Sequence, residues 1–362
     1  MSMPVQELER DALNDAKITA NSLGCDTDVT ITTLMYCLRS KSVNDYLSAI
    51  KEFGYIVYFS PIVDGDFVEI NPKHIARMSE RQSLEEVEFF RSIDILSGFN
   101  AYEGVLFLPF VIPPDKLEAL KPTRENMTLN YIPSMLNYLY KMDFKTEVTN
   151  LVAAQYTNWK DPSDSNSIRL QITKLLGDVS YGTPAIEMAR LHKKSNVSRN
   201  FMYHFTPTPS RRWIPTPSWI PGATHSDELL FMFGGIGYIG VGEQNAWEID
   251  LVNKMVTYWT NFIKSGDPNI PVSITPRWLE YNLKSGDYLE LEKFMSNSSA
   301  GRLFYAEEAN FWLDVFPALI EAVHKDGSDC DDPVYTSAAA EDPVYWMKSL
   351  IMAMLLLQLI RP

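Results

Sequence analysis

Two apolar segments that each lead into a small polar turn constrain the fold of this chain most. Residues 92–97 are expected to form a strand, and Glu103 follows shortly after the end of that strand. A second expected strand, 201–205, leads through a proline-rich loop, 207–221, to a turn that contains His225. In open α/β sheets, catalytic groups collect beyond the carboxyl ends of the strands. An acid and a histidine placed in this way are two of the three parts of a Ser-His-Glu relay.

The rest of the sequence alternates between segments with helical periodicity and short strand-like segments. We expect helices where apolar residues recur at helical spacing, at 5–23, 30–39, 43–51, 83–91, 128–142, 145–158, 167–176, about 184–192, 246–264 and 306–323. Further strands are expected at 55–59 and, as two short stretches, within 277–291. The helix at 246–264 should end at Gly266, because Pro268 follows two residues later. This pattern favours a loop-rich α/β or α+β protein.

The charge and the motif content exclude several classes of function. The chain has 46 acidic and 32 basic residues, a net charge of −14, which argues against a nucleic-acid partner because the chain would repel phosphates. The five histidines show no spacing typical of zinc ligands. There is no Walker loop and no G-x-G-x-x-G motif that opens a βαβ unit. We therefore expect no metal and no cofactor.

The end of the chain differs in character from the rest. Residues 325–345 are acidic and repeat the sequence Asp-Pro-Val-Tyr, which is typical of a linker, and residues 346–362 are hydrophobic. A membrane span needs about 20 apolar residues, more than this segment contains without interruption. Three interpretations stand: a short transmembrane helix, a GPI-anchor signal, or a terminal helix that packs on the protein. We expect one domain at 1–324, a linker, and a C-terminal segment that is a candidate membrane anchor.

Cysteines and sequons indicate an oxidising compartment. Cys25 and Cys37 flank a polar segment and could close a small loop. Asn126, Asn196 and Asn297 each begin an Asn-x-Ser/Thr sequon for glycosylation. Together these features favour a protein at the cell surface, with an extracellular domain, or a secreted one. The first ten residues lack the apolar stretch of a signal peptide, so either the chain is cytoplasmic or its true N-terminus lies outside this sequence.

The nucleophile of a relay is not found in the sequence. In α/β enzymes of this kind the serine usually lies in G-x-S-x-G on a sharp strand-to-helix turn, upstream of the acid. Ser180 lies in the sequence GDVSYG, which has one residue too many, and NSSAG at 297–301 lacks the leading glycine. No serine before Glu103 lies in such a turn. This chain alone cannot complete a Ser-His-Glu relay.

A series of motifs, in order along about residues 15–323, resembles the cholinesterase/carboxylesterase family, and within it most closely the neuroligins. The matching motifs are Cys25 with CLRSK at 37–41, PIVDGD at 61–66, NAYEG at 100–104, HSDELLFMFG at 225–234, TYWTNFIKSGDPN at 257–269, and FW at 311–312 with FP at 316–317. The resemblance implies the C-terminal portion of an α/β-hydrolase fold, with a mixed sheet flanked by helices. In this family NAYEG holds the triad acid, here Glu103, and HSDE holds the triad histidine, here His225.

The resemblance also carries structural expectations. It implies a disulfide between Cys25 and Cys37, and a homodimer formed through helices near 128–142 and 306–323. The second of these helices is expected to expose an apolar face made of Phe311, Trp312, Val315 and Phe316. The resemblance places the nucleophile elbow and the signal peptide before residue 1, so that residue 1 corresponds to an interior position of the full domain.

The first functional hypothesis is a neuroligin-like, catalytically inactive adhesion protein that engages a neurexin-type partner at the cell surface. Neuroligins can keep the acid and the histidine while lacking the serine, so Glu103 and His225 do not separate adhesion from catalysis. The loop that follows Glu103, residues 105–110, is too apolar to supply calcium ligands. Any calcium ion in such a complex would be held mainly by the partner.

The alternative hypothesis is a carboxylesterase or cholinesterase that hydrolyses carboxylic or choline esters and whose serine lies outside this chain. In that enzyme His225 is the general base, and Glu103 orients it and stabilises the imidazolium. A G-x-S-x-G motif in the upstream transcript would favour this hypothesis. A third interpretation is that the chain is a non-functional fragment from an incomplete gene model, which should express poorly because its sheet would lack neighbouring strands.

Overall fold

The computed structural model describes residues 12–53, 62–66, 85–140, 144–194, 197–233 and 245–325. Several features expected from the sequence lie outside the described residues, namely the strand at 55–59, the sequon at Asn196, the linker from residue 326 onward and the hydrophobic segment 346–362. Of the described residues, those up to Glu88 and those from Phe89 onward form two compact units.

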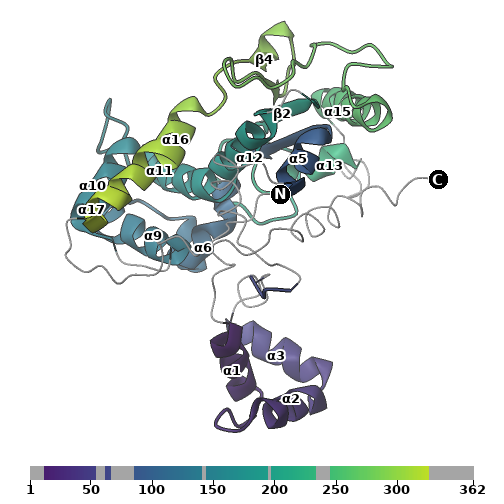
Figure 1. The fold of residues 1–362 in the computed structure, drawn as a ribbon. Helices are drawn as coiled ribbons and strands as arrows, with labels where there is room; N and C mark the ends of the chain where they lie inside the picture. The colour runs from purple at the N-terminus through teal and green to yellow at the C-terminus, as the bar shows by residue number, and fades with distance from the viewer. Residues whose placement is uncertain are drawn as a thin grey trace. The chain divides into compact units, whose positions relative to one another are not determined.

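Three helices lie in the described part of the first unit before residue 54 (Figure 1). They are α1 (Ala12–Ser22), α2 (Ile31–Ser40) and α3 (Val43–Phe53), in agreement with the helices expected at 5–23, 30–39 and 43–51 over the described range. Thr30 starts α2 because its hydroxyl accepts a hydrogen bond from the Thr33 backbone N–H at 3.3 Å. The short helices share one small hydrophobic cluster.

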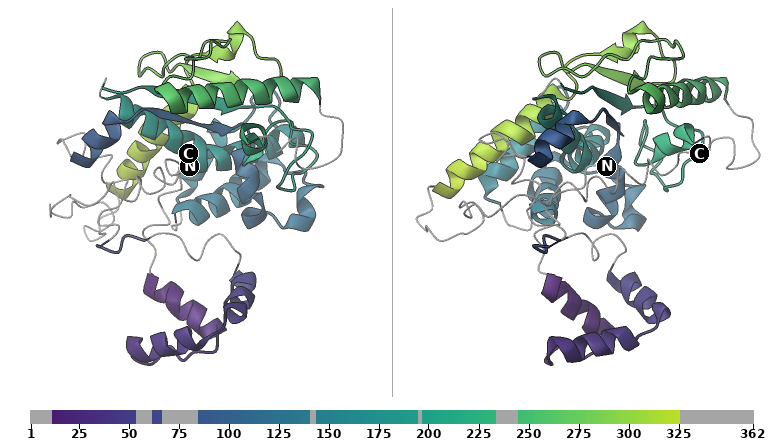
Figure 2. Two further views of the ribbon diagram at one scale, coloured as in Figure 1. Left: turned by 90° about the vertical axis from the view of Figure 1, so that its right-hand side faces the viewer. Right: turned by 45° about the vertical axis from the view of Figure 1, so that its right-hand side comes forward.

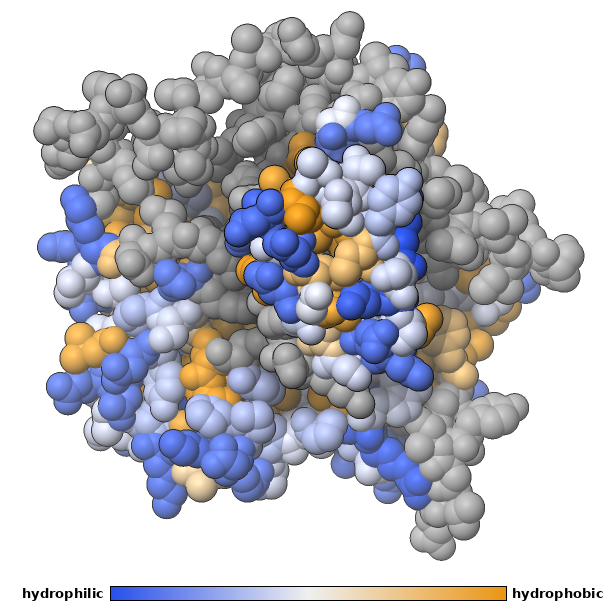
Figure 3. All heavy atoms as spheres, turned by 90° about the horizontal axis from the view of Figure 1, so that it is seen from below, coloured by the Kyte–Doolittle hydropathy of each residue, from blue (hydrophilic) through white to orange (hydrophobic). Residues whose placement is uncertain are grey.

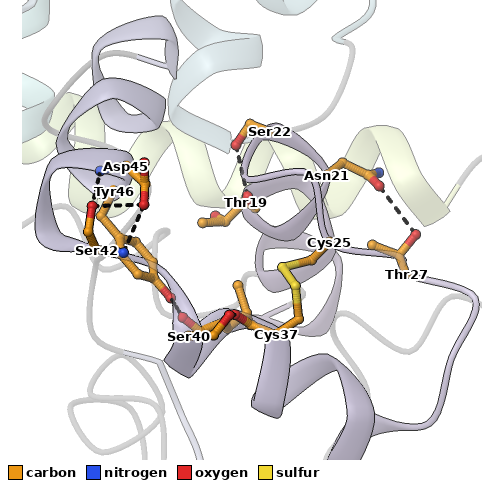
Figure 4. Close-up of a disulfide and its surroundings, with 11 residues drawn as sticks. Thr19, Asn21, Ser22, Cys25, Thr27, Cys37, Ser40, Ser42, Asp45 and Tyr46 are labelled. Atoms are coloured by element: carbon orange, nitrogen blue, oxygen red, sulfur yellow. Dashed lines mark hydrogen bonds between the residues drawn. A yellow bond between two sulfur atoms is a disulfide. The ribbon is translucent and has the colours of Figure 1, made fainter.

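A disulfide closes the loop between α1 and α2 (Figure 4). Cys25 and Cys37 are bonded, with their Cα atoms 5.9 Å apart. The Tyr46 hydroxyl on α3 donates to the Leu38 carbonyl on α2 at 2.9 Å, which ties the third helix to the second. A unit with so small a cluster buries little apolar surface, so a cross-link that restricts the unfolded chain is a substantial contribution to its stability.

A four-stranded mixed sheet organises the second unit (Figure 2). Its strands are β1 (Ile95–Asn100), β2 (Asn200–Phe205), β3 (Tyr288–Leu291) and β4 (Ala300–Gly301), in that order across the sheet. The first three strands are parallel, and β4 is antiparallel to β3. Because β1 and β2 pair along their whole lengths, their carboxyl ends lie side by side. The expected mixed sheet flanked by helices is confirmed.

Two strand assignments differ from the prediction. The strand predicted at 92–97 is shifted to Ile95–Asn100, because Ser92 still belongs to helix α5 (Glu85–Ser92). Of the two strands predicted within 277–291, only β3 is present. Trp278 and Tyr281 give this segment its strand-like sequence, but they are core residues of an irregular segment, at 1% and 4% exposure.

Helices cover both faces of the sheet, and the alternation of side chains along β2 assigns each helix to its face. Phe201, Tyr203 and Phe205 pack in one hydrophobic cluster with α15 (Ala246–Ser265). Met202 packs in another cluster with α12 (Thr183–Lys193). Figure 2 shows α15 running along its face of the sheet. This helix ends at Gly266, which adopts a φ of 69° and is the predicted stop.

The connection from β1 to β2 is mostly helical and forms the largest hydrophobic cluster among the described residues. Its elements are η2 (Glu103–Phe107), α6 (Leu108–Val111), α7 (Pro114–Leu117), α8 (Arg124–Asn126), η3 (Met127–Tyr131), α9 (Ile132–Tyr140), α10 (Thr146–Gln155), α11 (Ser165–Gly177), η4 (Asp178–Gly182) and α12. The helices predicted at 128–142, 145–158, 167–176 and 184–192 fall within this set. The helix α11 packs directly on η2. The helical connection therefore supports the turn that carries Glu103.

The expected exposed face of the last helix is wrong for three of its four residues. The predicted helix at 306–323 is present as α16 (Ala306–Asn310), the π-helical turn η6 (Phe311–Val315) and α17 (Phe316–Lys325). Phe311, Trp312 and Phe316 are 5%, 5% and 3% exposed and belong to the core, whereas Val315 is 41% exposed. The reason is that the helix packs on the β1–β2 connection, where the Trp312 indole N–H donates to the Tyr156 hydroxyl at 2.7 Å. Homodimerisation stays a prediction.

The surface carries two of the expected sequons. Asn297 is exposed in the short helix η5 (Asn297–Ser299). Asn126 is half-buried, and its side-chain carbonyl accepts from the Thr123 backbone N–H at 3.2 Å. Figure 3 shows a face in which hydrophilic residues surround smaller hydrophobic areas. Among the helices that the structure describes, none is both long and apolar enough to cross a membrane.

Candidate active site

The site lies where the chain leaves β1 and where a second segment returns beside it. β1 ends at Asn100, and Glu103 begins η2 three residues later. The backbone N–H of Tyr102 donates to the Ala223 carbonyl at 2.8 Å, and Tyr102 forms a parallel bridge with Thr224. The two segments are therefore joined by backbone contacts immediately before Glu103 on one side and His225 on the other.

Gly104 allows the turn that carries Glu103 to lie close to α11. A methyl group at this position would be 1.9 Å from the Thr173 carbonyl oxygen and 2.6 Å from the Gly177 backbone nitrogen. Because both neighbours are backbone atoms, no side-chain rotation can relieve the overlap. The glycine after the acid is thus required by backbone packing, and it sets the depth at which Glu103 is buried, at 5% exposure.

The turn that carries His225 is held by Asp227. This residue starts helix α13 (Asp227–Met232), and its Oδ2 accepts from the Thr224 backbone N–H at 2.7 Å and from the Thr224 hydroxyl at 3.1 Å. Arg212 from the proline-rich loop pairs with the same oxygen at 3.4 Å. Ser226 adopts a φ of 70°, a conformation that costs a serine free energy. The surrounding hydrogen bonds hold the strained turn in place.

Glu103 and His225 form a direct hydrogen bond. His225 Nδ1 lies 2.7 Å from Glu103 Oε2, and the two side chains are 17% and 7% exposed. A carboxylate only accepts hydrogen bonds, so Nδ1 carries a proton, and in the neutral imidazole the lone pair is on Nε2. The second oxygen of Glu103, Oε1, accepts from the Asn100 backbone N–H at 2.7 Å. The structure thus brings together the two residues that the sequence singled out, although they are 122 positions apart.

The surroundings of His225 favour its protonated form. Burial lowers the pKa of the imidazole, but the hydrogen bond and the negative charge of Glu103, together with the charges of Glu228 and Asp227, outweigh burial and raise it above the ordinary value. The Tyr181 ring lies beside the imidazole, with ring centroids 5.0 Å apart. The result is an oriented, partly exposed histidine of increased basicity.

A second carboxyl group lies close to this pair. Asn100 Nδ2 donates to the Thr224 carbonyl at 2.9 Å and also to Glu228 Oε2. Burial, and then the nearby charge of Glu103, raise the pKa of Glu228 to about 7, against the opposing effect of the Asn100 hydrogen bond. Sequence reasoning assigned no role to Asn100, Glu228 or Tyr181. The only sequence signal for the first two is that they belong to the NAYEG and HSDE motifs.

No serine completes the relay in the part of the chain that the structure describes. No hydroxyl there hydrogen-bonds to His225. The Ser180 hydroxyl is fully buried in η4 and has no hydrogen-bond partner among the described residues. Ser299 in NSSAG donates to Glu292 Oε1 at 2.6 Å. The two imperfect matches to G-x-S-x-G are thus buried residues rather than exposed nucleophiles.

The other histidines and acidic side chains of the described residues form no comparable cluster. No group of three or more histidine, cysteine, aspartate and glutamate side chains is arranged there to hold a metal ion. Two other described histidines have other contacts: His192 is buried and hydrogen-bonds to the Ile93 carbonyl at 2.8 Å, and His204, which is half-buried, lies among aromatic rings. Burial lowers the pKa of His204 to about 4, so it is neutral at physiological pH.

Comparison with known proteins places these residues in a family context. A family model described as the carboxylesterase family matches residues 2–312. The chain is 31% identical to Carboxylesterase 5A of Canis lupus familiaris over 315 residues, which cover 84% of this chain and 48% of that protein.

Two further relatives differ in kind from each other. The chain is 27% identical to Neuroligin-2 of Rattus norvegicus over 331 residues (85% of this chain, 36% of that protein). It is also 27% identical to Bile salt-activated lipase of Mus musculus over 338 residues (88% and 51%). The chain spans about half or less of the length of these relatives.

Proposed function

The chain belongs to the carboxylesterase family, and from that premise we propose that Glu103 and His225 are the acid and the histidine of a carboxylester-hydrolase site. The observation that carries the proposal is the 2.7 Å hydrogen bond between Nδ1 of a partly exposed histidine and a buried carboxylate. A neuroligin-like protein can keep the same two residues, but hydrolysis is the function that uses an oriented, basic imidazole, and the chain is 31% identical to Carboxylesterase 5A against 27% to Neuroligin-2. The hydrolase therefore takes first place here, ahead of the adhesion function that the sequence favoured.

In the proposed mechanism His225 Nε2 takes a proton from a hydroxyl group as that group attacks the ester carbonyl. Glu103 keeps the imidazole in the tautomer protonated at Nδ1 and stabilises the imidazolium that forms. The same Nε2–H then protonates the departing alkoxide. The serine of a full relay is proposed to lie outside this chain. In the chain by itself, water is the hydroxyl that His225 can activate.

Hydrolysis of p-nitrophenyl acetate by the purified chain tests this proposal. A positioned general base contributes about 10²–10⁴-fold, so the wild-type chain should exceed His225→Ala by about tenfold or more, even without a serine. The rate should rise with pH as His225 loses its proton, and it should be slower in D₂O because a proton moves in the rate-limiting step. Free imidazole at equal concentration is the control. Equal rates for the wild type and His225→Ala would refute His225 as a general base in this chain.

The second candidate is a neuroligin-like adhesion protein that engages a neurexin-type partner. It is supported by the similarity to Neuroligin-2 over 85% of this chain, and it needs no serine beside His225. Immobilised chain should then bind a neurexin ectodomain in calcium and release it in EGTA. The loop after Glu103 buries Val105, Phe107 and Leu108, so calcium would be held mainly by the partner. Absence of binding at micromolar concentrations would contradict the adhesion candidate.

Location and assembly are proposed on the same basis. The Cys25–Cys37 disulfide is typical of oxidising compartments and supports an extracellular or cell-surface location. Asn297 is exposed and free to carry a glycan, so an expressed secreted form should lose mass on deglycosylation, and Asn297→Gln should reduce that loss. A homodimer would appear in sedimentation as twice the mass of the chain. The variant Val315→Asp tests the predicted helix at its exposed position without unpacking the core.

A further inference from the structure

We propose that Asn100 is a positioning residue that keeps Glu103 and His225 aligned for the hydrogen bond between them. This proposal rests on the hydrolase function proposed above. Asn100 is the last residue of β1 and is 1% exposed. It touches both halves of the site, the turn that carries Glu103 and the turn that carries His225.

The backbone of Asn100 orients Glu103. Its N–H donates to Glu103 Oε1 at 2.7 Å, while Glu103 Oε2 faces His225 Nδ1 at the same distance. A carboxylate with one oxygen fixed by the backbone cannot rotate without breaking that bond, so the other oxygen stays directed at the imidazole. A charge-assisted bond of this kind is about twice as strong as one between neutral groups.

The side chain of Asn100 holds the histidine turn from both sides. One amide nitrogen donates to the carbonyl of Thr224, which precedes His225, and to the carboxyl of Glu228, which follows it on α13. The two hydrogens on a single nitrogen satisfy two acceptors that flank the histidine. Aspartate at this position would lose both donors and add a carboxylate between Glu103 and Glu228.

The side-chain oxygen of the Asn100 amide lowers the stability of the folded protein. Asn100 Oδ1 is buried and has no hydrogen-bond partner among the described residues, and an unsatisfied buried acceptor costs about 1–3 kcal/mol. Such groups in native structures need an explanation, and they cluster at functional sites. The two donated bonds to the histidine turn supply that explanation.

Four charged groups surround the histidine turn, so a test of Asn100 must distinguish a change in geometry from a change in charge. Glu103 and Glu228 face Asn100 directly, and Asp227 with its partner Arg212 lies on the far side of Thr224. Loss of the Asn100 amide removes none of these four side chains and frees the turn, but it also removes the hydrogen bond that lowers the pKa of Glu228. The variants are therefore measured in a Glu228→Gln background, where an altered titration of His225 reports altered geometry rather than a changed charge at that position.

The experiment compares Asn100→Ala with the matched variant Asn261→Ala in the full chain. Asn261 on α15 is also 1% exposed, and its Nδ2 also donates to two carbonyls, those of Pro268 at 2.9 Å and Val272 at 2.8 Å. Both variants should lower the free energy of unfolding. Only Asn100→Ala should move the NMR titration midpoint of His225, downward, because the imidazolium loses its aligned carboxylate.

The outcomes separate this role from the proposed activity. An unchanged His225 midpoint in folded Asn100→Ala, or an equal shift in Asn261→Ala, would overturn the positioning role. If Asn100→Ala does not fold, Asn100→Ser, which keeps one donor, is measured in the same way and should give a smaller shift in the same direction. The titration needs no turnover, so a failed hydrolysis assay with a shifted midpoint would reject the hydrolase and leave the positioning role standing.

Discussion

Replacing Glu228 by glutamine should make the protein more stable at neutral pH, although it alters a group beside the candidate site. Burial, and then the charge of Glu103, raise the pKa of Glu228 from 4.5 to about 7 in the folded protein. At about 1.4 kcal/mol per pH unit, this corresponds to about 3 kcal/mol of folding free energy. The folded state binds this proton more tightly than the unfolded state. The stabilising contribution is therefore complete below pH 4.5 and is lost as the pH rises through about 7.

Urea unfolding of the wild type and of Glu228→Gln between pH 4 and pH 8 measures this effect. Glutamine keeps an oxygen that accepts from Asn100 but does not ionise, so the variant should not share the loss. The difference in unfolding free energy should grow to about 3 kcal/mol in favour of the variant by pH 8. Glu307→Gln, which removes an exposed carboxylate on α16, controls for the change in net charge. A constant difference across this pH range, or a variant that is less stable at pH 8, would refute the reasoning.

Three further substitutions test the packing around the site and in the first unit. Gly104→Ala places a methyl group 1.9 Å from the Thr173 carbonyl oxygen and should cost about 3 kcal/mol or more in urea unfolding; a loss below 1 kcal/mol would contradict the close packing of η2 on α11. Tyr156→Phe removes the hydroxyl that donates to Asp178 Oδ2 at 2.8 Å and should cost about 1–3 kcal/mol because buried partners are left unpaired; a neutral effect would argue against that network. Cys25→Ser opens the disulfide and should lower the stability of the first unit by about 3 kcal/mol. Limited proteolysis should then cut that unit first, and unchanged cleavage would count against the prediction.

Local sequence patterns were sufficient to identify the two halves of the pair. Glu103 comes soon after β1, and His225 lies in the turn that the chain reaches from β2 through the proline-rich loop 207–221, while the parallel strands β1 and β2 end at one edge of the sheet. The end of α15 was predictable because Gly266 can adopt a positive φ and Pro268 follows it. At the strand ends and at Gly266 a local sequence rule predicts the backbone, and the observed geometry agrees with that prediction.

Tertiary packing decided the features that the sequence did not predict. The pattern of Phe311, Trp312 and Phe316 shows that the last helix has an apolar side, but it does not show whether that side meets a second copy or the chain's own core. Similarly, Trp278 gives an irregular segment the appearance of a strand, since apolar content alone reports burial and not backbone pairing. The role of Asn100 depends on a contact with Thr224, 124 residues away, which no local pattern contains.

The titration of His225 by NMR, in the wild type and in Glu103→Gln, is the most direct test of the proposed acid–histidine pair. His225→Ala assigns the resonances by difference, and the ¹⁵N shifts report which ring nitrogen carries the proton. The wild type should titrate above the ordinary value of 6.5, with the neutral form protonated at Nδ1, and Glu103→Gln should lower the midpoint because the charge that favours the imidazolium is gone. A wild-type midpoint at or below 6.5, or a midpoint that Glu103→Gln leaves unchanged, would contradict the pair.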